Sequence, residues 1–125
     1  MQGVDGAVKS ASSLVYGKAI IAGQQGAALS CLVGNAVTAA AGSPAACATG
    51  QSIIFGYPAA SSAAITAVAD LKVEDFVFNT ASGTPAAIRI AQTLADLEDD
   101  GCYVEYTQAT DANTPFTTDI ETTGC

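Results

Sequence analysis

The chain has 125 residues, of which 50% are hydrophobic, and its 4 basic and 12 acidic side chains give a net charge of −8. This length predicts one domain, and because much of the apolar fraction is alanine, the core is expected to gain from covalent cross-links. A polyanion is repelled by phosphate backbones and anionic lipid surfaces, so nucleic acid is not an expected partner. No apolar run in these residues reaches the length of a membrane span.

An amphipathic helix is predicted over residues 1–23, because apolar side chains recur there at helical spacing. Asp5 and Lys9 are spaced for an i,i+4 ion pair, and Gly23 is a residue type that ends helices. The helix starts without an N-cap residue, so we expect it to be the second half of a longer helix. One apolar stripe consists of Val4, Val8, Ala11, Val15 and Ala22, a second of Ala7, Leu14 and Ile21, and the polar side of Asp5, Lys9, Ser12 and Tyr16.

Residues 24–50 are rich in Gly, Ala and Ser and contain no charged residue. Small side chains bury too little area to offset the entropy of ordering, so this composition predicts a variable linker, with a weak helical tendency around residues 27–41. Cys31 and Cys47 bracket its middle, and a disulfide between them is the simplest way to hold the linker against the domain.

A short strand is predicted at residues 53–55, followed by a short helix that ends at Ala69. Ser61 or Ser62 is expected to cap this helix, because a serine oxygen accepts a hydrogen bond from a free backbone N–H of the first turn. The side chains of Ile65 and Val68 are expected to form its inner face.

Residues 74–125 are predicted to form an antiparallel sheet of two hairpins, because the apolar period changes there from helical to alternating. The first hairpin pairs residues 74–80 with 86–92, and an acidic connector at 94–101 leads to the second. The second pairs residues 102–108 with 116–123 around a turn at 111–113. Expected inward side chains are Phe76, Phe78, Ile88 and Ile90, with Arg89 outward, and the expected cross-strand pairs are Tyr106 with Ile120 and Val104 with Thr122.

The expected fold class is therefore α+β, with the N-terminal amphipathic helix packed on one face of a four-stranded antiparallel sheet. We expect residues 1–125 to form a single globular domain. Its parts are the helix at 1–23, a loop region with a short helix at 24–70, and the sheet with the C-terminal region at 74–125.

The four cysteines, Cys31, Cys47, Cys102 and Cys125, allow three disulfide pairings. A bridge between Cys102 and Cys125 would close the second hairpin, but the expected register places Cys102 opposite Gly124, so a bulge or frayed strand end is needed. Zinc is disfavoured, because there is no C-x-x-C spacing and no histidine. Two disulfides are favoured over free thiols, which indicates an oxidising compartment and an exported protein.

Several stretches, taken in order, resemble those of type IV pilins, most closely the major pilins of the mannose-sensitive haemagglutinin type. The resemblance covers most of the chain and is weakest over residues 24–50 and 94–101. The stretches are Gln2–Ala7 (QGVDGA) continuing to Leu14–Ala19 (LVYGKA), Phe55–Pro58 (FGYP), Cys102–Thr107 (CYVEYT) and Thr122–Cys125 (TTGC).

The resemblance implies a long N-terminal helix whose apolar first half anchors the subunit in the membrane and later forms the filament core. Residues 1–23 would be its amphipathic second half, packed on the sheet. The family's processed N-terminal residue and early glutamate would lie ahead of these residues, so neither has a counterpart here. The resemblance also implies a disulfide between Cys102 and Cys125 that encloses a loop at the filament surface; the pair Cys31 and Cys47 is not a general family requirement.

The function that the resemblance implies is that of a structural subunit of an extracellular type IV pilus on the bacterial surface. Copies would polymerise through the N-terminal helix, with the inner-membrane assembly machinery as a further partner and membrane contact only through the preceding segment. Such filaments support surface attachment, biofilm formation and in some cases motility or DNA uptake. The alternatives are a pseudopilin of a type II secretion system and a minor pilin or adhesin that binds glycan directly.

No catalytic, cofactor or metal site is expected, because the chain lacks histidine and has no nucleophile beside an obvious activator. The run Asp96–Gly101 partly matches the start of a calcium loop but has Thr107 at the twelfth position, so a solvated connector is favoured over a calcium site. The lysines Lys18 and Lys72 are expected to solubilise the surface rather than to contact other subunits. The tyrosines Tyr16, Tyr103 and Tyr106 are expected to pack rather than to line a binding patch.

Overall fold

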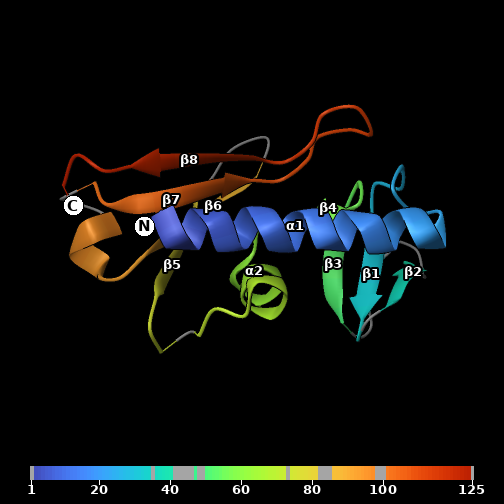
Figure 1. The fold of residues 1–125 in the computed structure, drawn as a ribbon, viewed down its shortest axis with the longest axis horizontal. Helices are drawn as coiled ribbons and strands as arrows, with labels where there is room; N and C mark the ends of the chain where they lie inside the picture. The colour runs from blue at the N-terminus through green and yellow to red at the C-terminus, as the bar shows by residue number, and fades with distance from the viewer. Residues whose placement is uncertain are drawn as a thin grey trace.

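The computed structural model describes residues 2–34, 36–40, 47, 50–72, 74–81, 86–97 and 101–124. The first sheet has the strand order β2-β1-β3-β4 and the second sheet the order β5-β6-β7-β8, and every pairing in them is antiparallel. Figure 1 shows both sheets along helix α1. The elements are α1 (Gln2–Ala22), β1 (Ser30–Val33), β2 (Ala36–Ala39), β3 (Gln51–Ile54), β4 (Tyr57–Pro58), α2 (Ser62–Ala69), β5 (Val77–Ala81), β6 (Ala87–Ala91), β7 (Tyr103–Thr107) and β8 (Thr117–Glu121).

The α+β class and the N-terminal helix are confirmed, whereas the expectation of one sheet is wrong. The two halves of α1 pack on different sheets, toward opposite ends of the helix (Figure 1). Each half therefore closes its own apolar core. The first core contains Val8, Ala60, Ile65, Ile88, Ile90 and Tyr106, and the second contains Val15, Ala19, Leu32, Val37 and Ile53.

The side of α1 that faces the protein matches the predicted first stripe in part: Val8 and Val15 are buried, whereas Ala22 is exposed. Asp5 and Ser12, placed on the polar side by sequence, are buried together with Val8, Val15 and Ala19. These five residues follow the i, i+3, i+4 spacing of a single helix face, so burying the two valines also buries Ser12 between them and Asp5 one turn before them. The predicted ion pair is confirmed: Lys9 Nζ lies 2.9 Å from Asp5 Oδ2.

The first sheet corrects the prediction of a linker over residues 24–50. Among the described residues 27–34 and 36–40 the chain forms the hairpin β1–β2, with Leu32 opposite Val37, and not a helix. Strand β3 pairs with the other edge of β1, and its Ile53 is fully buried. Three side chains, Leu32, Val37 and Ile53, pack on the second half of α1 and supply the apolar burial that the small residues around them lack.

Gly56 sits where the chain turns from β3 into β4 and has a φ of 87°. A Cβ at this position would lie 2.7 Å from the ring of Tyr16 on α1. The close approach lets Tyr57 stack on Tyr16, with ring centroids 4.5 Å apart. Glycine is therefore required here both by the left-handed backbone and by the contact with α1.

Helix α2 forms as predicted. Ser61 is its N-cap residue, and the Ser61 hydroxyl accepts a hydrogen bond from the Ala64 backbone N–H at 3.2 Å. Ile65 is fully buried and Val68 is partly buried against the second core, which confirms the predicted inner face.

The second sheet contains both predicted hairpins, but the register of the second one is wrong by two residues. Val104 lies opposite Ile120, and Tyr106 lies opposite Thr118. A shift of two residues keeps every side chain on the same face of the sheet, so the alternation of the sequence does not distinguish the two registers. The predicted turn at 111–113 is confirmed by the Asp111 carboxylate, which accepts a hydrogen bond from the Asn113 N–H at 2.7 Å.

The segment between the hairpins, predicted as an acidic connector, begins with a helical turn over residues 94–97. The Thr93 hydroxyl accepts a hydrogen bond from the Asp96 N–H at 3.2 Å, and Leu97 is buried. Residues 98–100 of the predicted connector lie outside the described residues. In Figure 1 the 94–97 turn lies at the end of the molecule where α1 begins.

Candidate interaction surface

An uncharged stripe runs along the side of α1 that points away from both sheets. Its members are spaced by three and four residues, like the buried stripe on the opposite side, so a straight partner could contact all of them. Three of them, Ala7, Leu14 and Ile21, form the second apolar stripe that the sequence predicts beside the first. The outer stripe consists of Gly3, Ala7, Ser10, Leu14, Gly17 and Ile21.

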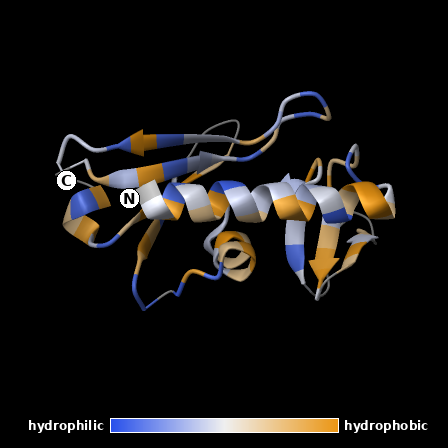
Figure 2. Cartoon of the chain, in the orientation of Figure 1, coloured by the Kyte–Doolittle hydropathy of each residue, from blue (hydrophilic) through white to orange (hydrophobic). Residues whose placement is uncertain are grey.

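The outer stripe changes in character along the helix. Its first half has only small side chains, whereas Leu14 is 63% exposed and Ile21 is 88% exposed. Ile20, beside the stripe, is 50% exposed, and Figure 2 shows the apolar end of α1. Exposed branched apolar side chains gathered on one helix end mark an interaction site more often than isolated ones do.

A hollow of about 160 Å³ lies beside this apolar end, between α1 and the edge strand β2. Lys18 is the charged residue at its wall, and the other walls are aliphatic. Val37 at its base is buried, whereas Ala36 is exposed. The lining residues are Lys18, Ile21, Ala22, Ala36 and Val37.

Charge is divided unevenly between the two halves of the sequence. Residues 6–69, which include the whole first sheet and α2, contain Lys9 and Lys18 and no Asp or Glu. Residues 70–125 hold 11 of the 12 carboxylates. The first sheet, α2 and the second half of α1 therefore contain no carboxylate, and three of the carboxylates, Glu105, Asp119 and Glu121, lie in strands of the second sheet.

The outer face of the second sheet is polar. Arg89 Nε donates a hydrogen bond to Glu105 Oε2 at 2.8 Å, and its guanidinium lies 4.6 Å from the centre of the Tyr103 ring. The bond to Glu105 is the main reason why the pKa of Arg89 is raised. A hollow of about 150 Å³ adjoins this cluster, which is the arrangement expected of a solvated sheet face. Its lining consists of Arg89, Tyr103, Glu105, Asp119, Ile120 and Glu121.

Glu121 lies where β8 ends. The Thr123 hydroxyl and backbone N–H both donate hydrogen bonds to the Glu121 carboxylate, and these bonds lower its pKa. Gly124 N–H donates to the Gly101 carbonyl at 3.1 Å, which holds the last residues against the segment before β7.

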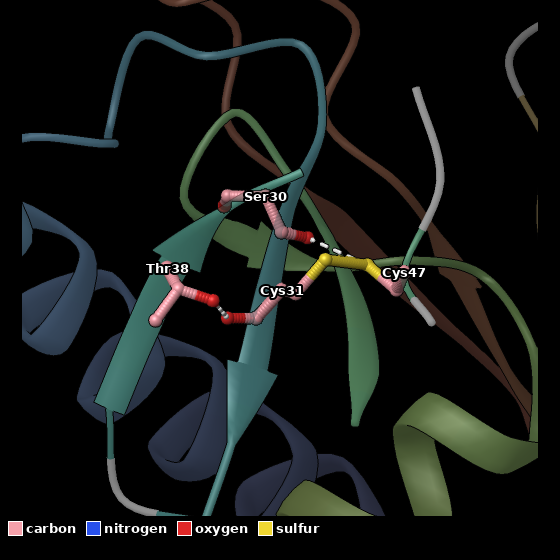
Figure 3. The surroundings of a disulfide bond; sticks show 4 residues. All are labelled: Ser30, Cys31, Thr38 and Cys47. Atoms are coloured by element: carbon pink, nitrogen blue, oxygen red, sulfur yellow. Dashed lines mark hydrogen bonds between the residues drawn. A yellow bond between two sulfur atoms is a disulfide. The ribbon is translucent and has the colours of Figure 1, made fainter. Parts of the chain in front are cut away.

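Of the two predicted disulfides, one is confirmed and the other stays a prediction. Cys31 and Cys47 form a disulfide, as predicted, with an S–S distance of 2.07 Å (Figure 3). The Thr38 hydroxyl donates a hydrogen bond to the Cys31 carbonyl at 3.5 Å, so the bridge is tied to both strands of the β1–β2 hairpin. Cys102 is not a free thiol. Cys125 lies outside the described residues, so its pairing with Cys102 stays a prediction.

The predicted tyrosine roles are confirmed in part. Tyr106 is fully buried in the first core, and Tyr16 stacks on Tyr57. Tyr103 instead lies on the outer face of the second sheet beneath Arg89. Lys72 is exposed, whereas Lys18 is partly buried at the hollow.

The described part of the chain contains no group of three or more His, Cys, Asp or Glu side chains that could hold a metal ion. Asp96 belongs to the 94–97 turn, and the carboxylates at 98–100 of the calcium hypothesis lie outside the described residues. Neither described helix combines the length and apolarity that crossing a bilayer requires.

Ala36 and Val37 were not expected to line a hollow, because residues 24–50 were predicted to be a linker. One local signal could have found them. The sequence Leu32-Val33-Gly34-Asn35-Ala36-Val37 places Gly-Asn between two apolar pairs, and this dipeptide is typical of two-residue hairpin loops.

Comparison of the chain with protein-family models, with curated proteins and with solved structures gives no match.

Proposed function

We propose that the protein is a structural subunit of an extracellular filament of the type IV pilin kind, and that copies pack through the outer stripe of α1. The function is assembly and not catalysis. In this proposal the fold is that of a pilin. Helix α1 is the amphipathic half of a longer helix, and the two sheets form the globular part that faces outward. Attachment of the cell to surfaces follows from a filament of such subunits.

The observation that carries the proposal is the absence of charge from the outer stripe in a chain of net charge −8. Repulsion between acidic copies opposes association unless the surfaces that meet are neutral. The outer stripe meets this condition, since it exposes glycine, alanine, serine, leucine and isoleucine along a helix of about 30 Å. Small residues in its first half allow another helix to approach closely.

The disulfide between Cys31 and Cys47 supports the location of the proposed filament. Disulfides of this kind form and persist in oxidising compartments such as the periplasm and the cell exterior. The bridge fixes the β1–β2 hairpin, which forms one wall of the hollow beside the outer stripe.

The proposal is tested by placing a charge on the outer stripe. Leu14→Glu is expected to reduce the yield of filaments sheared from cells at least tenfold, on the order of the penalty for burying an unpaired carboxylate. Because Leu14 is exposed, the variant is expected to unfold at the same urea concentration as the natural chain. Filament yield is measured by electron microscopy and by quantifying the subunit in the sheared fraction.

Ala67→Glu is the matched control, because it adds the same charge at an exposed position of the other helix, α2. If Leu14→Glu forms normal filaments, as Ala67→Glu is expected to do, copies do not pack through the outer stripe. A subunit that is scarce in filaments formed by another protein would favour a pseudopilin or minor pilin, and specific binding of a sugar by the chain would favour the adhesin.

A further inference from the structure

The two ends of the molecule expose different side chains. The first sheet and the second half of α1 contain no carboxylate of their own, and they carry Lys18 and the aliphatic hollow. The other end, where α1 begins, carries the 94–97 turn (Figure 1). A contact between unlike ends of two copies would therefore bring opposite charges together, whereas contacts between like ends would not.

The 94–97 turn presents an apolar side chain in an acidic setting. Leu94 is 56% exposed, whereas Leu97 is buried and anchors the turn to the molecule. Asp96 lies two residues beyond Leu94 and is partly exposed. Of the large apolar side chains that the described residues expose, Leu94 is the one that lies outside the carboxylate-free half of the sequence; the others are Leu14, Ile20, Ile21 and Val33.

The hollow at the opposite end suits such a side chain. Apolar cavities of about 150 Å³ hold a group the size of benzene, and the hollow measures about 160 Å³. It is lined by Ile21, Ala22, Ala36 and Val37, together with Lys18, the one basic residue of the lining. An apolar side chain followed by a carboxylate would thus meet an apolar hollow bordered by an amine.

We infer that copies of the chain associate head to tail, with Leu94 of one copy seated in the hollow of the next and Asp96 facing the next copy's Lys18. This inference rests on the proposed filament and names the pair of surfaces that joins successive subunits. The two surfaces lie at opposite ends of α1, so the contact is heterologous and leaves a free hollow at one end and a free Leu94 at the other. Such a contact repeats without closing and produces an open chain.

The placement of large and small side chains along the outer stripe favours an axial offset between copies. Its large members, Leu14 and Ile21, lie in the second half of α1, and its small members lie in the first half. Parallel helices in register would bring leucine against leucine, whereas helices offset along their axis bring large side chains against small ones. An offset pair of helices is also the arrangement that brings unlike ends together.

The test is thiol cross-linking of assembled filaments made from the whole chain. Ala36→Cys places a thiol at the hollow and Ala95→Cys places one beside Leu94, and both alanines are exposed. Treatment of the double variant with a short bismaleimide is expected to give a ladder of covalent multimers. Each single variant is expected to stay monomeric, and a mixture of the two single variants is expected to give dimers only.

Further substitutions test the chemistry of the contact in the double variant. Leu94→Glu is expected to reduce the ladder about tenfold, because a carboxylate replaces the apolar side chain. Lys18→Glu is expected to reduce it about fivefold at low salt, and Asp96→Lys in the same chain is expected to restore it. Lys72→Glu is the matched control, because it makes the same charge change at an exposed lysine outside the hollow, and it is expected to leave the ladder unchanged.

The outcomes separate this inference from the proposed function. Products that stop at the covalent dimer in the double variant would show a closed antiparallel pair and overturn the head-to-tail contact. Filaments that require Leu14 but give no cross-link between positions 36 and 95 would also overturn it, while leaving the proposed function intact. A chain that forms no filament and whose Leu14→Glu variant behaves like the natural one would overturn both.

Discussion

Tyr106 joins three parts of the molecule through one buried side chain. Its ring stacks on Phe116 with centroids 5.4 Å apart, and Phe116 in turn lies edge-on to Tyr57, which stacks on Tyr16 of α1. The Tyr106 hydroxyl donates a hydrogen bond of 2.6 Å to the Pro58 carbonyl in β4. This bond connects the second sheet to the first, so a residue predicted to pack in the sheet also connects the two sheets.

Removing the hydroxyl tests this connection. Tyr106→Phe is expected to lower the free energy of unfolding by about 1–2 kcal/mol, because the ring stays buried and the Pro58 carbonyl loses its donor. Urea denaturation followed by circular dichroism measures the change. Tyr103→Phe, on the outer face, is the control and is expected to change stability by less than about 0.5 kcal/mol.

The same pair of variants tests how the free energy of unfolding depends on pH. Burial raises the pKa of Tyr106 above its ordinary value of 10.0. Since the folded pKa is the higher one, the neutral hydroxyl contributes fully to stability below about pH 10, and this contribution is lost as the pH rises from the unfolded toward the folded pKa. The free energy of unfolding is therefore expected to fall less steeply above pH 10 in Tyr106→Phe than in Tyr103→Phe, and equal slopes would contradict this.

At the scale of elements, the first sheet depends on non-local contacts. Strands β1, β2 and β3 have four residues each, and alanine and serine are common among them. Such strands are marginal alone, because their small side chains bury little apolar area. The disulfide between Cys31 and Cys47 and the contacts of Leu32 and Val37 with α1 supply the missing stabilisation.

Removing this disulfide is expected to lower the free energy of unfolding by about 3 kcal/mol, the value that loop closure gives for a separation of 16 residues. The change is made as Cys31→Ala with Cys47→Ala, so that Cys102 is untouched, and is measured by urea denaturation. Ser30→Ala, at the buried residue next to Cys31, controls for disturbance of β1. A loss no greater than that of the control would mean that the bridge adds no stability.

At the scale of the whole molecule, α1 is shared by two cores. Val8 belongs to the core with the second sheet, and Val15 and Ala19 belong to the core with the first. A helix of 21 residues is cooperative along its length, so loosening one half is expected to weaken the packing of the other. The two sheets are therefore expected to unfold together, although no strand pairing joins them in the described residues.

Val8→Ala is expected to lower the free energy of unfolding by about 2 kcal/mol through lost burial and an unfilled cavity. If the cores are coupled, amide exchange at Leu32 and Ile53 in the first sheet accelerates by the same free energy, as measured by native-state hydrogen exchange. Leu14→Ala on the outer stripe is the control and is expected to leave these rates within about twofold. Unchanged exchange at Leu32 in Val8→Ala would show that the two sheets open independently.

Local signals were sufficient for much of the fold. The apolar period and Gly23 predicted α1, Ser61 predicted the start of α2, and alternation predicted both hairpins of the second sheet. The spacing of Cys31 and Cys47 predicted their disulfide. Each of these features depends on residues close in sequence, on regular periodicity or on residue types with strong positional preferences.

Three features were decided by tertiary structure. The register between β7 and β8 follows from packing, since a two-residue shift preserves the alternating pattern. The face of α1 that is buried follows from the presence of two sheets, which cover Asp5 and Ser12 and expose Leu14. The first sheet itself forms because β1 pairs with β3 and packs on α1, and small residues carry no local pattern that records such distant partners. The sequence alone thus determined the two helices, the two hairpins of the second sheet and the division of charge between its two halves, because these depend on local patterns. Only tertiary packing decided the first sheet and which surface of α1 stays open to a partner.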